Sequence, residues 1–243
     1  MSKSFFIDTT LCTACRGCQV ACKQWHDLPA EKTINRGSFQ NPADLSFQTY
    51  KLVRFSEEVI DKKLHWLFFP DQCRHCVDAP CLYTADDPTA IFKDPATGAI
   101  IFTANTKKLD ADAIIESCPY DIPRKAADGT LAKCDMCLDR VQNGELPACV
   151  KTCPTGAMHF GETDEILAMA EKRLSQVKKT FSKAALLDAD YVNTIYLTAH
   201  EPYLYHNFAV AASARPKNNG MTRQTALKTM FKPFTAAART LAG

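Results

Sequence analysis

The sequence predicts an α+β fold whose short elements surround three groups of cysteines. Short apolar runs are separated by turn residues, which is typical of strands, and two longer segments have helical periodicity. All twelve cysteines lie between residues 12 and 153. We therefore expect a cysteine-bearing body that is followed by a helical or extended C-terminal arm.

Two β-hairpins and two helices are expected along the chain. Each hairpin is indicated by two apolar or alternating runs on either side of turn residues. The second helix is indicated by an N-cap residue, Thr163, before a periodic segment. The predicted strands are residues 46–55 with 64–69 and residues 90–92 with 99–102, and the predicted helices are residues 109–117 and 163–177.

The C-terminal segment is basic. No acidic residue follows Glu201, whereas six basic residues do: Arg215, Lys217, Arg223, Lys228, Lys232 and Arg239. A basic segment with scattered Phe, Leu and Met fits an arm that becomes ordered on a partner subunit. A solvated, disordered tail is the alternative interpretation.

The composition excludes several classes of function. Lysine plus arginine (29) nearly balance aspartate plus glutamate (27), so the net charge gives no argument for binding nucleic acid. Dinucleotide, P-loop, H-E-x-x-H and G-x-S-x-G motifs are absent from the sequence, so we expect no nucleotide-dependent or hydrolytic active site in it. The N-terminal residues lack the apolar stretch of a cleavable signal, and charged residues interrupt each candidate transmembrane segment.

The spacing of the cysteines is typical of iron–sulfur proteins. The first group has the C-x2-C-x2-C-x3-C spacing of bacterial ferredoxins, in which the fourth cysteine binds the neighbouring cluster. This exchange pairs the first group with the last one along the chain. It predicts one [4Fe-4S] cluster on Cys12, Cys15, Cys18 and Cys153, and a second on Cys22, Cys134, Cys137 and Cys149.

The middle group predicts a third cluster. Cys73, Cys76 and Cys81 supply three thiolates, and Cys118 is the cysteine left for the fourth position. A paired fourth cluster would require cysteines at four positions that instead hold Ala85, Lys108, Ala111 and Ile114. Since one complete ligand set is missing, the twelve thiolates account for three [4Fe-4S] clusters.

Two other uses of the cysteines fit the spacing less well. Disulfides do not explain three C-x-x-C spacings or four cysteines between residues 12 and 22. Zinc is bound by C-x-x-C pairs, but four cysteines so close together make a poor zinc pattern.

Several other residues are weaker candidates. His75 lies between two cysteines, but thiolates already fill the site, so we expect a surface role or a supporting one. Lys133 and Lys151 flank cysteines and could raise a cluster potential by their charge, with solvation as the alternative. Trp25 and Trp66 are expected to pack against the body. The remaining histidines show no metal-binding spacing: His26, His65, His159, His200 and His206.

These assignments predict two ferredoxin-like modules. Residues 1–30 and 130–162 form the first module, with two clusters, and residues 31–129 form an inserted hairpin and the second module, with one cluster. Residues 163–243 form a helix and the basic extension, which is expected to dock on a partner subunit.

The motifs resemble the iron–sulfur subunit of the molybdopterin oxidoreductases, which include formate dehydrogenase, nitrate reductase, dimethyl sulfoxide reductase and thiosulfate or polysulfide reductase. Most members carry four clusters, so this chain departs from them at the four missing positions. Its three-cluster pattern without a membrane helix is similar to the beta subunit of soluble tungsten or molybdenum formate dehydrogenases of sulfate-reducing bacteria. The resemblance covers about residues 5–162 and rests on Ile7–Cys22, Cys73–Cys81, Cys118–Arg124, Lys133–Arg140 and Pro147–Ala157.

The resemblance implies that this chain performs no bond chemistry itself. A large catalytic subunit with a pterin-bound tungsten or molybdenum would oxidise formate or reduce carbon dioxide, and this chain would relay electrons to an acceptor such as a multihaem cytochrome c. If the missing cluster was terminal, the Cys73 cluster is the exit and the other two lie nearer the catalytic subunit. Export together with that subunit implies a periplasmic location, and the cytoplasm is the alternative.

Three competing functions stay open at this point. The equivalent subunit of a thiosulfate, polysulfide or sulfoxide reductase would have the same ligand pattern, because substrate choice lies in the other chain. A free-standing polyferredoxin would need no long cysteine-free extension. A structural zinc protein would contain zinc and no acid-labile sulfide.

Overall fold

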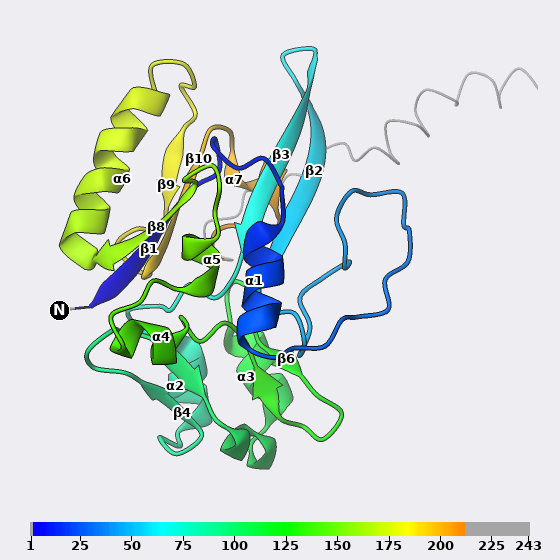
Figure 1. The fold of residues 1–243 in the computed structure, drawn as a ribbon, viewed down its shortest axis with the longest axis vertical. Helices are drawn as coiled ribbons and strands as arrows, with labels where there is room; N and C mark the ends of the chain where they lie inside the picture. Colours follow the sequence, from blue (N-terminus) through cyan, green and yellow to red (C-terminus); the bar gives the residue numbers. More distant parts are fainter. Residues whose placement is uncertain (1, 212–243) are drawn as a thin grey trace, which may run out of the picture.

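Figure 1 presents the computed structural model, which describes residues 2–211. At its centre is a four-stranded mixed sheet in the order β8-β1-β10-β9. β1 (Lys3–Asp8) pairs in parallel with β10 (Thr194–Thr198) and antiparallel with β8 (Met158–Glu162), and β9 (Ala185–Leu187) pairs antiparallel with β10. All six basic residues of the predicted arm lie outside the described residues, so the arm stays a prediction.

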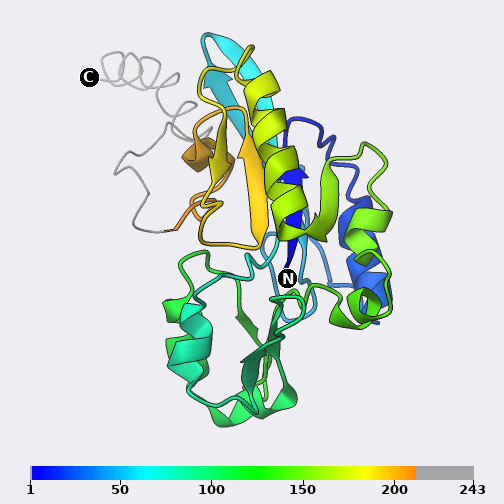
Figure 2. The same cartoon turned by 90° about the vertical axis from the view of Figure 1, so that its left-hand side faces the viewer.

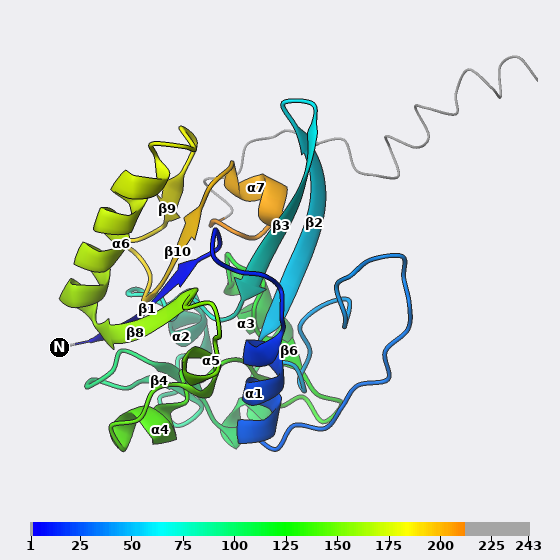
Figure 3. The ribbon, with the colours of Figure 1, turned by 45° about the horizontal axis from the view of Figure 1, so that its top comes forward.

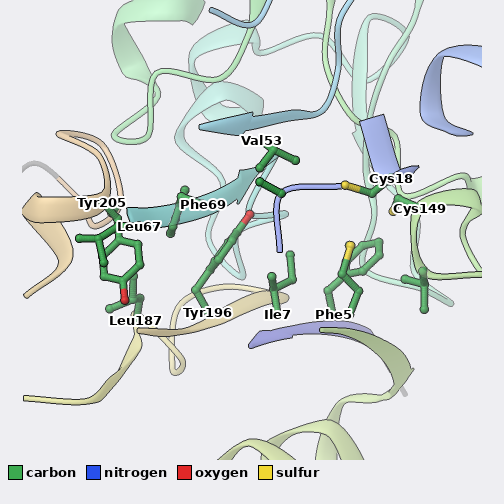
Figure 4. Packing of buried hydrophobic residues seen from close by; sticks show 14 of the residues in the cluster. Phe5, Ile7, Cys18, Val53, Leu67, Phe69, Cys149, Leu187, Tyr196 and Tyr205 are labelled. Carbon is green, nitrogen blue, oxygen red and sulfur yellow. The ribbon is translucent and has the colours of Figure 1, made fainter. Parts of the chain in front are cut away.

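Both faces of the sheet are buried, because alternate side chains of β1 and β10 point into two different apolar cores. Phe6 and Ile195 pack with residues of α6 (Thr163–Val177), which lies along one face of the sheet in Figure 2. Tyr196 belongs to the opposite core, which Figure 4 shows from close by. There the Tyr196 ring stacks on Phe69, with 4.3 Å between the ring centroids.

A long β-hairpin contributes to the core opposite α6. It consists of β2 (Leu52–Ile60) and β3 (Lys63–Asp71), paired along their whole length. β3 is longer than predicted, β2 begins and ends later along the chain than predicted, and the turn is shorter, because Asp61 and Lys62 alone form it. Their φ angles of 50° and 66° are those of a tight two-residue hairpin turn. The end of the hairpin projects from the body in Figure 1, which explains why polar residues occur within its strands.

A small lobe lies below the sheet in Figure 2 and has its own apolar core, which includes Ile91, Ile100 and Ile114. The second predicted hairpin is confirmed here as the antiparallel pair β4 and β5. The predicted helix before Cys118 is also present, and the Asp110 carboxylate accepts hydrogen bonds at its N-terminus. The elements of the lobe are α2 (Pro80–Ala85), β4 (Ile91–Lys93), β5 (Ile100–Phe102), the 3-10 helix η1 (Ala104–Lys108), α3 (Ala111–Ser117), β6 (Arg124–Lys125) and β7 (Leu131–Ala132).

Four further short helices belong to the described chain: α1 (Gly17–Trp25), α4 (Leu138–Gln142), α5 (Ala148–Lys151) and α7 (Pro202–Tyr205). α1 packs against α5, and Figures 1 and 3 show the two helices close together beside β8. Because Ile7 of β1 pairs with Met158 of β8, residues from the two ends of the cysteine-bearing segment lie next to each other. No helix within residues 2–211 is long and apolar enough to cross a membrane.

The residues after α6 differ most from expectation. We assigned residues 163–243 to a helix and a basic extension that docks on a partner; the helix is present as α6, but β9 and β10 after it belong to the central sheet. Every residue of β10 is buried, so the strand has no polar face that a sequence pattern could reveal. Thr163 is also not the N-cap. That position is Glu162, and the Thr163 hydroxyl donates to the Ser2 carbonyl oxygen at 2.8 Å.

The position of β10 predicts the effect of truncating one of its side chains. Ile195→Ala removes a fully buried side chain between α6 and the sheet, which typically costs about 2–5 kcal/mol. We expect the midpoint of thermal unfolding of the anaerobically purified protein to fall by at least about 4 °C. Tyr191→Ala is the control, because Tyr191 is 71% exposed. Equal midpoints for the two variants would contradict this role of β10.

Candidate iron–sulfur sites

The first group of neighbouring thiols comes from the two ends of the cysteine-bearing segment. Cys12, Cys15 and Cys18 lie in and just after the loop between β1 and α1, and Cys153 follows α5. Burial raises the pKa of Cys12, and the proximity of Cys153 and Cys15 adds to this effect. Cys18 is buried and Cys15 is exposed. We call these four residues the first site.

The second site consists of Cys22, Cys134, Cys137 and Cys149. Burial raises the pKa of Cys22 well above its usual value, with further contributions from Cys149 and Cys137. Burial also raises the pKa of Cys134, and Cys22 and Cys149 are among the groups that act on it. All four thiols are buried.

The third site is a pocket in the small lobe that is lined by Cys73, Cys76, Cys81 and Cys118 together with Lys133. Burial raises the pKa of Cys118 to about 11 and that of Cys81 to about 12. Cys76 has a raised pKa for the same reason, and the other three thiols add to it. In each predicted set the cysteines thus lie near other members of that set, while the division into ligand sets and cluster binding stay predictions.

All twelve thiols belong to the described residues, and each is free rather than part of a disulfide. Because burial is the largest cause of the raised pKa values, the thiols that have a raised pKa are neutral without a metal. Metal binding requires the thiolate form, so a metal in these sites would displace protons from them.

The backbone of each C-x-x-C loop has the same unusual conformation. The residue before the second cysteine has a positive φ in all three groups: 53° at Ala14, 45° at His75 and 67° at Met136. This region is unfavourable for residues other than glycine and is found at functional sites, where it turns backbone N–H groups toward a bound anion. Accordingly, the N–H of His75 donates to Cys73 Sγ at 3.3 Å, and the N–H of Ala14 lowers the pKa of Cys12 against the effect of burial.

The third site is attached to the central sheet through the residues that precede and begin β10. The Arg74 carbonyl accepts hydrogen bonds from the N–H groups of Asn193 and Thr194, both at 3.0 Å. The Thr194 hydroxyl donates to the Cys73 carbonyl at 2.9 Å. A β-bridge joins Cys76 to Val192. This loop is therefore held at a defined position beside the sheet.

Thiols of different sites lie close together. Cys149 of the second site acts on the pKa of Cys18 in the first, which places these two thiols close together. Both belong to one apolar core and are labelled side by side in Figure 4. Cys73 of the third site in turn acts on the pKa of Cys134 in the second. The second site is thus adjacent to both of the others.

Buried donors without an acceptor support the fit of an anionic group near the third site. Among the described residues, Gln72 Nε2, Arg74 Nε and Nη2, and His75 Nε2 are buried and have no hydrogen-bond partner. Such donors are costly unless something accepts their hydrogen bonds. A cluster with thiolate ligands and sulfide would supply acceptors, so the donor set is chemically suited to it.

His75 is fully buried, so a surface role for it is wrong and a supporting role fits. Its Nδ1 accepts a hydrogen bond from the N–H of Ile100 at 3.0 Å, which leaves the ring proton of the neutral form on Nε2. Burial, with a smaller contribution from Lys133, lowers the pKa of His75 well below its usual value. His75 is therefore a neutral donor beside the cysteines.

The lysines and tryptophans singled out in the sequence differ in how far they are exposed to solvent. Lys133 is buried and donates to the carbonyl oxygens of Ile100 and Cys134, whereas Lys151 is exposed. Trp66 is 63% exposed, so packing against the body is wrong for it. Trp25 is 43% exposed, and the Arg140 guanidinium lies over its ring at 4.1 Å.

The sequence analysis did not predict the burial of two charged groups, Asp71 with its arginine partners and Lys51. Asp71 forms ion pairs with Arg54 (2.6 Å) and Arg74 (3.0 Å), and all three side chains are almost completely buried. Burial alone would raise the pKa of Asp71, but the two guanidinium groups hold it below its usual value. Lys51 is also fully buried, and its ammonium donates to Gln72 Oε1 and to the Pro70 carbonyl. Charged residues next to short apolar runs usually face solvent, which is why sequence reasoning missed them.

The fold and the thiol sites define an iron–sulfur protein, and comparison with known proteins agrees. Residues 64–163 match the family model of a 4Fe-4S dicluster domain. The chain is 59% identical to formate dehydrogenase subunit beta of Megalodesulfovibrio gigas over 215 residues, which are 87% of this chain and 100% of that protein. It is 55% identical to formate dehydrogenase 2 subunit beta (cytochrome c-553) of Nitratidesulfovibrio vulgaris, over 86% and 99% of the two chains.

A more distant relative is the iron–sulfur subunit of the nitrate-inducible formate dehydrogenase of Escherichia coli. It is 37% identical over 95% of this chain and 78% of its own length. The chain belongs to the family of iron–sulfur (beta) subunits of formate dehydrogenases. Members of this family are non-catalytic electron-transfer subunits of an oxidoreductase complex.

The buried ion pairs of Asp71 predict a strong effect of removing its charge. Asp71→Asn leaves Arg74 without a carboxylate partner among the described residues and leaves Arg54 with Asp44 alone, and breaking a buried pair in this way costs about 3–5 kcal/mol. We expect a clearly lower midpoint of thermal unfolding for the variant. The matched control is Asp112→Asn, which breaks an exposed pair with Lys125 and should change little. Similar midpoints for both variants would contradict this assignment.

Proposed function

We propose that this chain carries three [4Fe-4S] clusters and relays electrons from the molybdopterin (tungsten or molybdenum) subunit of a formate dehydrogenase to an external acceptor. The observation that carries the proposal is that the twelve free thiols lie near other members of their predicted sets of four. The ligands of each cluster are the four cysteines of the first, second and third site. When bound, each cluster would accept and release one electron at a time.

The proposed organisation is two ferredoxin-like modules. Residues 1–30 with 130–162 form the module of the first and second sites, and residues 31–129 form the insertion and the module of the third site. The pairing of β1 with β8 supports the first module, and the separate apolar core of the small lobe supports the second.

The adjacency of the sites supports a direction for the relay. Since the second site is adjacent to both of the others, electrons that enter at the first or the third site leave at the other. We place the entrance at the first site, because the exposed Cys15 brings that site to the surface. The exit is then the third site. The four positions that lack cysteines, including Ala85 and Ile114, belong to the same lobe, which is consistent with loss of a terminal cluster.

The acceptor in this proposal is a cytochrome c. The name of the Nitratidesulfovibrio vulgaris relative, formate dehydrogenase 2 subunit beta (cytochrome c-553), supports this class of acceptor. We further propose that the chain works in the periplasm after export together with its catalytic subunit. Cell fractionation tests this point, and finding the complex in the cytoplasmic fraction would contradict it.

Metal analysis of the purified complex tests the cluster count. We expect about twelve irons and about twelve acid-labile sulfides per beta chain, in addition to those of the catalytic subunit. Cys118→Ala should lower both numbers by about four, because it removes one ligand of the third site. Ser117→Ala is the control, since its hydroxyl only donates to the Ile114 carbonyl. Zinc without sulfide would overturn the proposal.

Activity measurements test the exit. In the Cys118→Ala complex, formate-dependent reduction of an artificial dye by the catalytic subunit should persist, whereas reduction of cytochrome c should be almost abolished. The reason is that the dye takes electrons from the catalytic subunit, while the cytochrome depends on the third site. Unchanged reduction of cytochrome c in a complex that has lost this cluster would show that the third site is not the exit.

A further inference from the structure

Lys51 differs from the buried arginines Arg54 and Arg74. It is 2% exposed and lies immediately before β2, and its ammonium nitrogen donates to two neutral oxygens, Gln72 Oε1 and the Pro70 carbonyl at 3.3 Å. The buried guanidinium groups of Arg54 and Arg74 have Asp71 as a counter-charge. Lys51, in contrast, takes part in none of the ion pairs formed among residues 2–211.

An unpaired cation in the interior is strongly unfavourable, so its counter-charge must come from another group nearby. The groups that act on Lys51 most strongly, after burial, are Cys18, Cys149, Tyr196 and Cys134. Three of them are cysteines of the first and second sites. Conversely, the charge of Lys51 opposes the effect of burial on the pKa of thiols in both sites, namely Cys12, Cys18, Cys22 and Cys149.

Two buried acceptors hold the ammonium of Lys51 in place. Gln72, which accepts from its ammonium, is itself fully buried and directly precedes Cys73. The Pro70 carbonyl also accepts a hydrogen bond from the Tyr196 hydroxyl at 2.8 Å. If the ammonium turned toward solvent, the buried Gln72 Oε1 would lose this donor, so the folded structure favours the present position of the ammonium.

We propose that Lys51 is the built-in counter-charge of the first and second sites and that it raises the reduction potential of both clusters bound there. Four thiolates and the core of a cluster carry net negative charge, and reduction adds another electron. A fixed positive charge in a dry interior stabilises the reduced form more than the oxidised form. Lys51 thus acts on the clusters through its charge and is not a ligand. This inference rests on the proposed function, since it requires clusters in the two sites.

Lys133, which lies at the third site, is a matched comparison for Lys51. It is also buried, also donates only to neutral carbonyl oxygens, and lines the pocket of the third site. Its charge opposes the effect of burial on the pKa of Cys81. The two lysines have the same chemistry, but Lys133 lines the pocket of the third site whereas Lys51 acts on thiols of the first and second sites, so neutralising each one should affect different clusters most.

The experiment is a potentiometric titration of the anaerobically purified complex, monitored by electron paramagnetic resonance. In Lys51→Gln, two couples of this chain should become harder to reduce, by about tenfold in the equilibrium constant, which is about 59 mV for a one-electron couple. The third couple, identified by its absence in Cys118→Ala, should move least. Lys51→Arg keeps the charge and should keep the potentials close to those of the unmodified complex. In Lys133→Gln the third couple should move most.

Iron and sulfide analysis of the same samples separates this inference from the proposed function. If the unmodified complex lacks the expected clusters, the proposed function fails. If the clusters are present and Lys51→Gln leaves all potentials unchanged, or shifts the same couple as Lys133→Gln, the role of Lys51 is wrong. If Lys51→Gln and Lys51→Met lose iron while Lys51→Arg retains it, the sites require the charge, as proposed. Loss of iron from all three variants would instead indicate a packing role and overturn the proposal.

Discussion

The pairing of β1 with β8 is the constraint on which the rest of the structure depends. Ile7 lies opposite Met158, and the N–H of Asp8 donates to the Ala157 carbonyl at 2.8 Å. The loop that follows β1 and the segment that precedes β8 therefore lie at the same end of these two antiparallel strands, which brings Cys12 close to Cys153. A shift of one residue would turn the alternating side chains of β1 to the wrong faces, so the two buried cores specify this register.

Strand β10 extends the same constraint to the third site. It lies beside β1 in the sheet, and the residues at its beginning bind the backbone of the Cys73–Cys76 loop. The small lobe has its own apolar core, but its cysteine loop is attached to the central sheet by hydrogen bonds and by the bridge from Cys76 to Val192. Electron transfer depends on distance, so a relay requires attachments of this kind between its modules.

Charge in the interior is the second organising feature. Arg54 and Arg74 share the Asp71 carboxylate, and Asp44 adds a second carboxylate at Arg54, whereas Lys51 and Lys133 have only neutral acceptors and face the thiol sites. Under the proposed ligation, these two lysines and the unpartnered donors of Gln72, Arg74 and His75 meet the negative charge and sulfur acceptors that they lack within the described residues. The same groups that stabilise the folded body would then adjust the potentials of the clusters.

The sequence by itself predicted which cysteines form each ligand set, because the ligand spacing of an iron–sulfur cluster is a local chemical requirement that short motifs must satisfy. The hairpin of β4 and β5 and helix α3 were predictable for a similar reason, since turn residues and an N-cap act locally. Only the tertiary structure decided that β10 lies inside the sheet and that the second site is adjacent to both of the others. It also decided the burial of Lys51 and Asp71, because burial depends on what distant segments place around a residue, and no local pattern records that.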